Sequence, residues 1–291
     1  MKHVIATAAA AVAAAAGLAL VGVPAAGAAT TSSASASGTA AGPAAVRPLV
    51  RANVTLPNTH LPHQTSGAAT SAGNWSGYAD AANKGVALRY VQADWNVPSI
   101  SCARSTQSTA GEAVTSEWVG LDGFNSKTVE QTGITADCTG TAAAEYFAWY
   151  ALSPNAAVAF TGVAPGDAIS ASVYFNGTKY ETLLTDLTTG ARISTTQACP
   201  QAGTCKNSSA EVIVNNPADS ATIPGLADFG QVSFTSAQVT SRNGTKGTLA
   251  SGSLWKSTQL KLEDGSNGDV LATAGPLEGG AAFADTWVRS L

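Results

Sequence analysis

Regular alternation in one stretch of the chain decides the fold class. Residues 168–175 read Ala-Ile-Ser-Ala-Ser-Val-Tyr-Phe, so an apolar side chain recurs at every second position. A period of two places successive side chains on opposite faces of a β-strand. Residues 231–235, Gln-Val-Ser-Phe-Thr, follow the same pattern, and no long stretch beyond residue 28 has helical periodicity. The sequence therefore predicts an all-β fold.

Turn signals between the strands favour antiparallel pairing. Asn-Gly or Asp-Gly dipeptides, which suit tight hairpins, stand at 176–177, 243–244 and 264–265. Turn signals recur roughly every 8–12 residues, a spacing typical of sandwiches and barrels. Residues 72–291 therefore predict one β domain, of a length that a sandwich commonly reaches. We expect this domain to be monomeric.

The first 28 residues predict an export signal. Lys2 and His3 precede an alanine-dominated apolar run over residues 4–23, and Ala26-Gly27-Ala28 fits an A-x-A cleavage site. The run is nearly long enough for a membrane anchor, the alternative reading. No stop-transfer charges follow it, however, and no second apolar run exists. We expect a secreted, extracellular protein that leaves the membrane after signal cleavage.

Residues 29–71 differ from the rest in composition. They are rich in Ala, Ser, Thr, Gly and Pro, contain no Asp or Glu, and carry Arg47, Arg51, His60 and His63. Such a segment cannot bury enough apolar surface to fold alone. We predict a flexible pro-segment that is removed on activation; a passive linker is the alternative. The following domain holds nineteen acidic residues against twelve Lys and Arg, so it should attract this segment near neutral pH.

The four cysteines indicate disulfides, because an exported chain with an even number of cysteines usually pairs them. They are Cys102, Cys138, Cys199 and Cys205, and three pairings are possible. The last two enclose a loop short enough to close locally, which leaves Cys102 with Cys138. A zinc site is the alternative, but no CxxC spacing or histidine supports it.

The residue inventory excludes several kinds of chemistry from the domain. All three histidines, His3, His60 and His63, precede it, which argues against a Ser-His-Asp or Cys-His triad and a histidine metal site. No phosphate loop or dinucleotide fingerprint occurs, so no cofactor and no metal is predicted. The acidic balance argues against a nucleic-acid partner. Carboxylates, amides and hydroxyls remain as catalytic groups.

Some acidic residues lie inside apolar, strand-like runs: Asp122, Glu211 and Asp228. In residues 210–214, Ala-Glu-Val-Ile-Val, Glu211 shares a strand face with Ile213. Burial would raise the pKa of this carboxyl and make it a usable general acid or base. From the pattern alone, an exposed charge is the favoured reading. Gln131 could donate a hydrogen bond to an oxyanion, although by pattern it also favours the surface.

Seven motifs stand in an order that resembles the glutamic peptidases, the eqolisin family. They are Asn74-Trp75-Ser76-Gly77-Tyr78, Asp94-Trp95-Asn96-Val97-Pro98, Trp118-Val119-Gly120-Leu121-Asp122-Gly123, Gln131-Thr132-Gly133, Ala148-Trp149-Tyr150, Ala210-Glu211-Val212-Ile213-Val214 and Ala227-Asp228-Phe229-Gly230-Gln231-Val232-Ser233-Phe234. Each motif is weak, but the ordered set is specific. The resemblance implies a concanavalin-like sandwich of two large antiparallel sheets, with peptide substrate across a concave face.

The resemblance also assigns roles to individual residues. It implies that Glu211 and Gln131 are catalytic, with Glu211 activating a water and Gln131 stabilising the oxyanion. Trp118, Asp122 and Trp149 would belong to the supporting wall of the substrate cleft. We therefore expect an acid endopeptidase that acts on protein or peptide substrates and is made as a zymogen.

Two positions depart from the family pattern. Ala151 and Thr135 stand where the family has or often has acids, and Asp137 and Glu145 are the candidates to compensate. Such acids tune the pKa of a catalytic glutamate. Their loss keeps a non-catalytic peptide- or glycan-binding sandwich open as the main alternative function. A glycoside hydrolase is a third reading, but it would need two facing carboxylates.

Overall fold

The computed structural model describes residues 47–56, 73–105, 112–139, 143–217, 224–250 and 252–290. All of them belong to one compact unit, Pro43–Leu291. They form seventeen β-strands and one short 3-10 turn, Cys102–Arg104, without any α-helix. The all-β prediction is therefore confirmed. None of these elements is a helix that could cross a membrane. The predicted signal, residues 1–28, lies outside the described residues.

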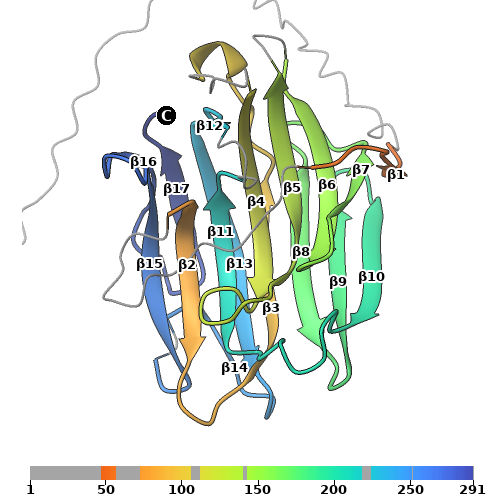
Figure 1. Cartoon of the computed structure of the whole chain (residues 1–291), viewed down its shortest axis with the longest axis vertical. Coiled ribbons are helices and arrows are strands. Elements are labelled where there is room, and N and C mark those ends of the chain that lie inside the picture. The colour runs from red at the N-terminus through yellow and green to blue at the C-terminus, as the bar shows by residue number, and fades with distance from the viewer. Residues whose placement is uncertain are drawn as a thin grey trace, which may run out of the picture. The chain divides into compact units, whose positions relative to one another are not determined.

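Eight strands form a front sheet in the order β1–β7–β6–β5–β4–β11–β2–β15, with every neighbouring pair antiparallel (Figure 1). Their bounds are β1 (Val50–Arg51), β7 (Val158–Thr161), β6 (Glu145–Leu152), β5 (Glu130–Thr139), β4 (Glu112–Leu121), β11 (Ser209–Asn215), β2 (Trp75–Ala82) and β15 (Trp255–Glu263). The short strand β12 (Gly225–Leu226) lies parallel to the start of β4.

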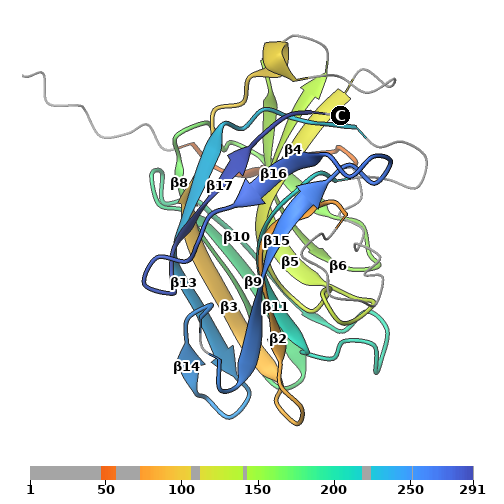
Figure 2. The ribbon, with the colours of Figure 1, turned by 90° about the vertical axis from the view of Figure 1, so that its left-hand side faces the viewer.

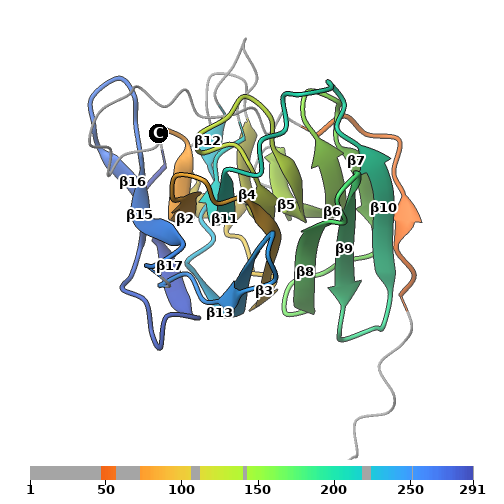
Figure 3. The ribbon, with the colours of Figure 1, turned by 90° about the horizontal axis from the view of Figure 1, so that it is seen from below.

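Six strands form a back sheet in the order β10–β9–β8–β3–β13–β14. Their bounds are β10 (Arg192–Ala198), β9 (Lys179–Asp186), β8 (Ala168–Phe175), β3 (Leu88–Asn96), β13 (Gln231–Ser241) and β14 (Lys246–Gly247). Strands β16 (Val270–Ala274) and β17 (Phe283–Trp287) connect β15 to β13 along one side, as Figure 2 shows. The view from below in Figure 3 shows the two layers of the predicted sandwich.

The alternation read from the sequence creates the core between the sheets. On β8, Ile169, Ala171 and Val173 are buried, whereas Ser170 and Ser172 are only partly buried. The predicted hairpins are also confirmed: the three Asn-Gly or Asp-Gly turns join β8 to β9, β13 to β14 and β15 to β16. Each turn fixes the register of its two strands, which sets the inward-facing residues.

A second apolar cluster covers the opposite face of the front sheet. We call it the front-face cluster; its buried members are Leu56, Trp75, Ala79, Trp118, Val129, Phe147, Trp149, Ala151, Ala159, Ile213 and Leu260. All except Leu56 and Val129 lie on strands of that sheet. The front sheet therefore has apolar side chains on both faces, and those of the front-face cluster are buried in the full chain.

Both disulfides follow the pairing that local loop closure suggested. Cys102 is bonded to Cys138, and Cys199 to Cys205, with Cα–Cα distances of 5.5 and 6.0 Å. No free cysteine occurs among the described residues. The first bond ties the loop after β3 to β5, and the second closes the loop between β10 and β11.

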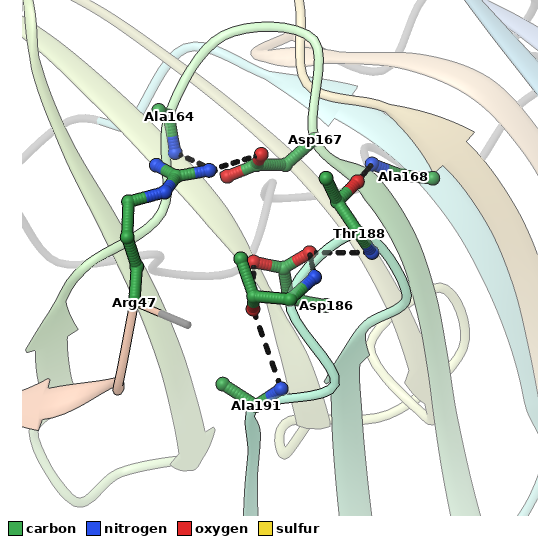
Figure 4. A network of polar contacts seen from close by, with 8 residues as sticks. Arg47, Ala164, Asp167, Ala168, Asp186, Thr188 and Ala191 are labelled. Carbon is green, nitrogen blue, oxygen red and sulfur yellow. Dashed lines mark hydrogen bonds and ion pairs between the residues drawn. The ribbon is translucent and has the colours of Figure 1, made fainter. Parts of the chain in front are cut away.

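Part of the predicted pro-segment, residues 47–56, packs on the domain. Strand β1 adds to the edge of the front sheet beside β7, and the carboxylate of Asp167 pairs with the guanidinium of Arg47 (Figure 4). The Asp167 side chain is only 4% exposed. A Cβ on Gly162 would lie 2.4 Å from the carbonyl oxygen of Pro48, so only glycine lets this segment approach so closely.

Candidate active site

Glu211 and Gln131 lie in one row across the front sheet. Glu211 on β11 pairs with Gly120 on β4, and Gly120 pairs with Gln131 on β5. Residues that are directly opposite in a β-ladder point to the same face, so both side chains stand on the face of the front-face cluster. With about 4.8 Å between neighbouring strands, their backbones are about 10 Å apart. Two long side chains can converge on one small group across that span.

Gly120, which lies between the two residues in this row, allows the Trp118 ring and Val129 to pack closely against the backbone. A Cβ at this position would lie 2.8 Å from Cζ3 of Trp118, 3.2 Å from a methyl of Val129 and 3.3 Å from the carbonyl oxygen of Glu130. Any side chain here would therefore push against the tryptophan, which lies beside Glu211 and Gln131. This glycine is a feature of the candidate site that the sequence pattern did not single out.

Two of the predicted wall residues, Trp118 and Trp149, lie in the next row of the same face. Trp118 pairs with Gly133, and Gly133 pairs with Trp149. The Trp118 indole donates a hydrogen bond to Oδ1 of Asn215 at 3.0 Å and meets Trp75 edge-on, with ring centroids 4.9 Å apart. These contacts hold buried indole rings beside the pair.

Asp122 lies at the end of β4 and binds backbone rather than lining the aromatic row. Its carboxylate accepts the backbone N–H groups of Lys206 and Asn207, both at 2.7 Å, and of Ser208 at 2.8 Å. The Ser208 hydroxyl also donates to it at 2.9 Å. This carboxylate thus clamps the loop that leads into β11, three residues before Glu211.

The Glu211 carboxyl is fully buried. Burial raises the pKa of Glu211 well above its usual value, and the charges of Asp122 and Asp80 raise it further. The Ser209 hydroxyl and the Phe124 backbone approach it without completing a hydrogen bond, so they offset this only in part. Gln131 is also buried, at 1% exposure. The surface positions that the strand pattern favoured for both residues are therefore wrong.

Residues 73–274 match the family model described as the Peptidase A4 family. The chain belongs to this family. It is 30% identical over 191 residues to Aspergillopepsin-2 of Aspergillus niger and 33% identical over 184 residues to Scytalidopepsin B of Scytalidium lignicola. These alignments cover 60% of this chain, and 66% and 65% of the two relatives, so the chain spans just under two thirds of each.

A solved structure shares the fold of this Peptidase A4 member. The crystal structure of scytalido-glutamic peptidase with a peptide-based transition-state analog superposes with a TM-score of 0.60 at 25% identity. The match covers 74% of this chain and 98% of that chain. The eqolisin resemblance and the two-sheet sandwich that it implied are both confirmed.

The two departures from the family pattern lie on the face that carries Glu211 and Gln131. Ala151 pairs directly with Gln131, and Thr135 lies four residues farther along β5, where its hydroxyl meets that of Ser116 at 2.5 Å. Asp137 and Glu145 pair with each other six residues beyond Gln131, about 20 Å away along the strand. The idea that these two acids compensate is therefore wrong. The acids whose charges act on Glu211 are Asp122 and Asp80.

We predict that Gly120→Ala lowers kcat of the processed enzyme by about 100-fold, because a displacement of about 1 Å in a catalytic group can cost that much. Steady-state kinetics, with the melting temperature measured in parallel, check this. Gly265→Ala is the matched control, because its added Cβ meets no atom within 4 Å. A Gly120→Ala enzyme with normal turnover would show that the close packing of Trp118 on Gly120 is not needed for catalysis.

Proposed function

We propose that this Peptidase A4 member is a secreted acid endopeptidase that cleaves protein or peptide substrates with Glu211 and Gln131. The observation that carries the proposal is the register that places both side chains on one face, separated only by Gly120. The family match supports the reaction class. Trp118 and Trp149 are buried in the full chain, in the same cluster as Leu56, and would line the peptide site once the segment that carries Leu56 leaves, since apolar side chains beside a few polar groups are typical of binding sites.

The chemistry needs no group beyond this pair and a water. Glu211 as carboxylate takes a proton from the water, whose oxygen attacks the scissile carbonyl carbon. Gln131 donates an amide N–H to the oxyanion that forms. Glu211 then gives the proton to the leaving nitrogen as the C–N bond breaks, which regenerates the carboxylate. The described residues contain no group of His, Cys, Asp and Glu that could hold a metal ion.

The raised pKa of Glu211 supports a latent form of the full chain. Leu56 of the predicted pro-segment belongs to the front-face cluster, on the same face as Glu211. A neutral, desolvated glutamic acid cannot take a proton from water. Release of the segment would admit water, lower the pKa of Glu211 toward its ordinary value of about 4.3 and make the carboxylate available in mild acid.

One experiment separates this proposal from the binding-protein and glycosidase alternatives. The processed protein is incubated with denatured protein and with a panel of polysaccharides between pH 2.5 and 7, with and without a chelator, thiol reagents, serine reagents and pepstatin. We expect peptide cleavage that peaks in acid and survives all four treatments. Peptide binding without cleavage, polysaccharide cleavage, or chelator-sensitive cleavage would contradict it.

We predict that Gln131→Ala lowers kcat by about 10²–10³, the cost of one oxyanion donor, while KM changes little. Gln231→Ala, an exposed glutamine at the start of β13, is the control and should be indistinguishable from the parent. Initial rates on a fluorogenic peptide at the optimal pH check this. Equal losses in both variants, or a Gln131→Ala loss confined to KM, would argue against an oxyanion role.

We further propose that residues 29–71 inhibit the domain near neutral pH and leave it in acid. Within the described part, Arg47 pairs with the carboxylate of Asp167, β1 pairs with β7, and Leu56 lies in the front-face cluster. Acidification first charges His60 and His63, near a pKa of about 6.5, and strengthens the attraction to the acidic domain. Below about pH 4 the carboxylates become neutral and the attraction is lost.

We predict that an added peptide of residues 29–71 inhibits the mature enzyme most strongly between pH 5 and 6, and several-fold less at pH 3. An Arg47→Gln peptide should bind more weakly than the parent peptide at pH 5–6, because it loses the ion pair with the Asp167 carboxylate. Inhibition constants on a small substrate at two salt concentrations check both. Absence of inhibition, or inhibition that grows steadily down to pH 3, would rule out the electrostatic mechanism.

A further inference from the structure

The loop that precedes Glu211 is held at two places. At one, the Asp122 carboxylate binds three successive backbone N–H groups, those of residues 206–208. At the other, the Cys199–Cys205 disulfide closes the loop on itself. Because Glu211 follows within three residues, the position of this loop sets the start of β11 and therefore the position of the catalytic carboxyl.

Glu130 contacts this loop from the core side of the front sheet. Its side chain is fully buried, and Oε1 lies 3.1 Å from Sγ of Cys205. A disulfide sulfur carries no hydrogen, so it can only accept a hydrogen bond. A hydrogen bond in this contact therefore requires the hydrogen of a neutral Glu130 carboxylic acid. Consistent with this, burial first and then the charge of Asp122 raise the pKa of Glu130 to about 9.

The groups that face Glu130 offer no countercharge. Asp122 repels an ionised form, and Tyr180 on β9 donates its hydroxyl to Oδ1 of Asn207 at 2.7 Å. Lys206 turns its ammonium to the carbonyl of Gly203. Arg242 acts on Tyr180, not on Glu130. The four ion pairs found among the described residues also leave Glu130 out.

Glu130 connects the two halves of the catalytic pair. It precedes Gln131 on β5, and successive strand residues point to opposite faces. Gln131 therefore faces the substrate side, while Glu130 reaches the loop that leads to Glu211 from the core side. A shift of that loop relative to β5 would change the spacing between Glu211 and Gln131.

We propose that Glu130 is a positioning residue for the proposed peptidase reaction: its neutral carboxyl, hydrogen-bonded to the Cys199–Cys205 disulfide, holds the Asp122-bound loop in place behind the catalytic pair. The contact needs a buried, uncharged donor. Glutamine at this position retains such a donor, whereas leucine keeps a similar volume and removes it. This inference rests on the proposed function only for its effect on turnover; the contact itself can be tested without activity.

The test compares the processed parent, Glu130→Gln and Glu130→Leu at pH 4. The first measurement is the rate at which a phosphine reduces each disulfide, read by alkylation and mass spectrometry. We expect Cys199–Cys205 to be reduced at least 10-fold faster in Glu130→Leu than in the parent and Glu130→Gln. The Cys102–Cys138 bond serves as the internal control and should be unaffected. Equal acceleration of both bonds, or of neither, would overturn the proposal.

The second measurement is peptidase turnover by the same three proteins. We expect kcat of Glu130→Leu to fall about 100-fold with little change in KM, and Glu130→Gln to retain parental kcat. Parental turnover in Glu130→Leu, or equal losses in both variants, would contradict a positioning role. If the parent itself does not cleave peptides, the proposed function is wrong, but the reduction rates still test whether Glu130 protects the Cys199–Cys205 disulfide. Should Glu130→Leu not fold, a Cys199→Ser, Cys205→Ser protein replaces it and must show the same kcat loss.

Discussion

Replacing Glu211 by glutamine is expected to lower kcat of the processed protein by about 10⁴-fold or more. The proposed mechanism uses this carboxyl twice, as a base toward water and as an acid toward the leaving nitrogen, and general acid–base catalysis alone contributes about 10²–10⁴ per role. Glutamine keeps the size of the side chain but cannot carry the proton. Single-turnover and steady-state assays in acid, with the melting temperature of each protein, check this.

Glu117→Gln is the matched control for that experiment. Glu117 lies on β4, next to the strand of Glu211, and is equally buried, but it points into the core, three residues from Gly120. Removal of a buried carboxyl is thus common to both variants, and only the location differs. Retained activity in Glu211→Gln would contradict the proposed mechanism. Equal inactivation of both proteins would mean that lost stability, not lost chemistry, explains the result.

The fold could be predicted from the sequence because its information is local. The period of two in residues 168–175 depends only on neighbouring residues, and each Asn-Gly or Asp-Gly turn joins strands that are adjacent in the chain. The disulfide pairing could also be narrowed, since Cys199 and Cys205 are close in sequence. By contrast, the addition of residues 47–56 to β7 depends on a pairing more than a hundred residues apart, which no local pattern indicates.

The site depended on long-range register and could not be read from local patterns. The face that Glu211 shares with Ile213 was predicted correctly, but a strand pattern does not reveal what covers that face. Only the family resemblance pointed to Glu211 and Gln131. Gly120 lies between Glu211 and Gln131 only because β4 separates β11 from β5. The contact of Glu130 with Cys205 forms only because a loop from another part of the chain packs against β5.

Acidic side chains usually lie at the surface, but this fold buries several that no sequence pattern indicated. Asp80, Glu117, Glu130 and Asp285 are all fully buried. None of them belongs to an ion pair in the described residues. Instead they lie near hydroxyls: Ser76 donates to Asp285 at 2.9 Å. Neutral carboxylic acids tolerate such places far better than carboxylates do.

Those four carboxyls lead to the second large prediction: the folded protein should lose stability steeply as pH rises from 4 to 8. Burial raises the pKa of Asp80 and Glu117 to about 8, of Glu130 to about 9 and of Asp285 to about 7. In the unfolded chain all four titrate near pH 4. Between these values the native state binds more protons than the unfolded state, so the free energy of unfolding falls as pH increases.

The size of the effect follows from the number of protons. Each proton held only by the native state costs about 1.4 kcal/mol of stability per pH unit. A net difference of even one or two protons would remove several kcal/mol between pH 4 and 7, out of the roughly 5–15 kcal/mol typical of a domain. We expect the melting temperature to drop by about 10 °C or more over that range. The stabilisation is fully present below pH 4 and is lost through the native pKa values near 7 to 9.

Thermal unfolding followed by circular dichroism from pH 3 to 8 measures this directly, and two variants test its cause. Glu117→Gln and Asp285→Asn each replace an ionisable group by a neutral one of similar shape, so each should flatten the pH dependence and raise stability at pH 7 relative to pH 4. Exposed Asp264→Asn should leave the slope between pH 4 and 8 unchanged, because hydrogen bonds from Ser266 lower the pKa of its carboxyl instead of raising it. A melting temperature that stays constant or rises toward neutral pH would mean that the buried carboxyls ionise freely in the native fold. In that case the acid preference of the proposed peptidase would need a cause within the catalytic pair alone.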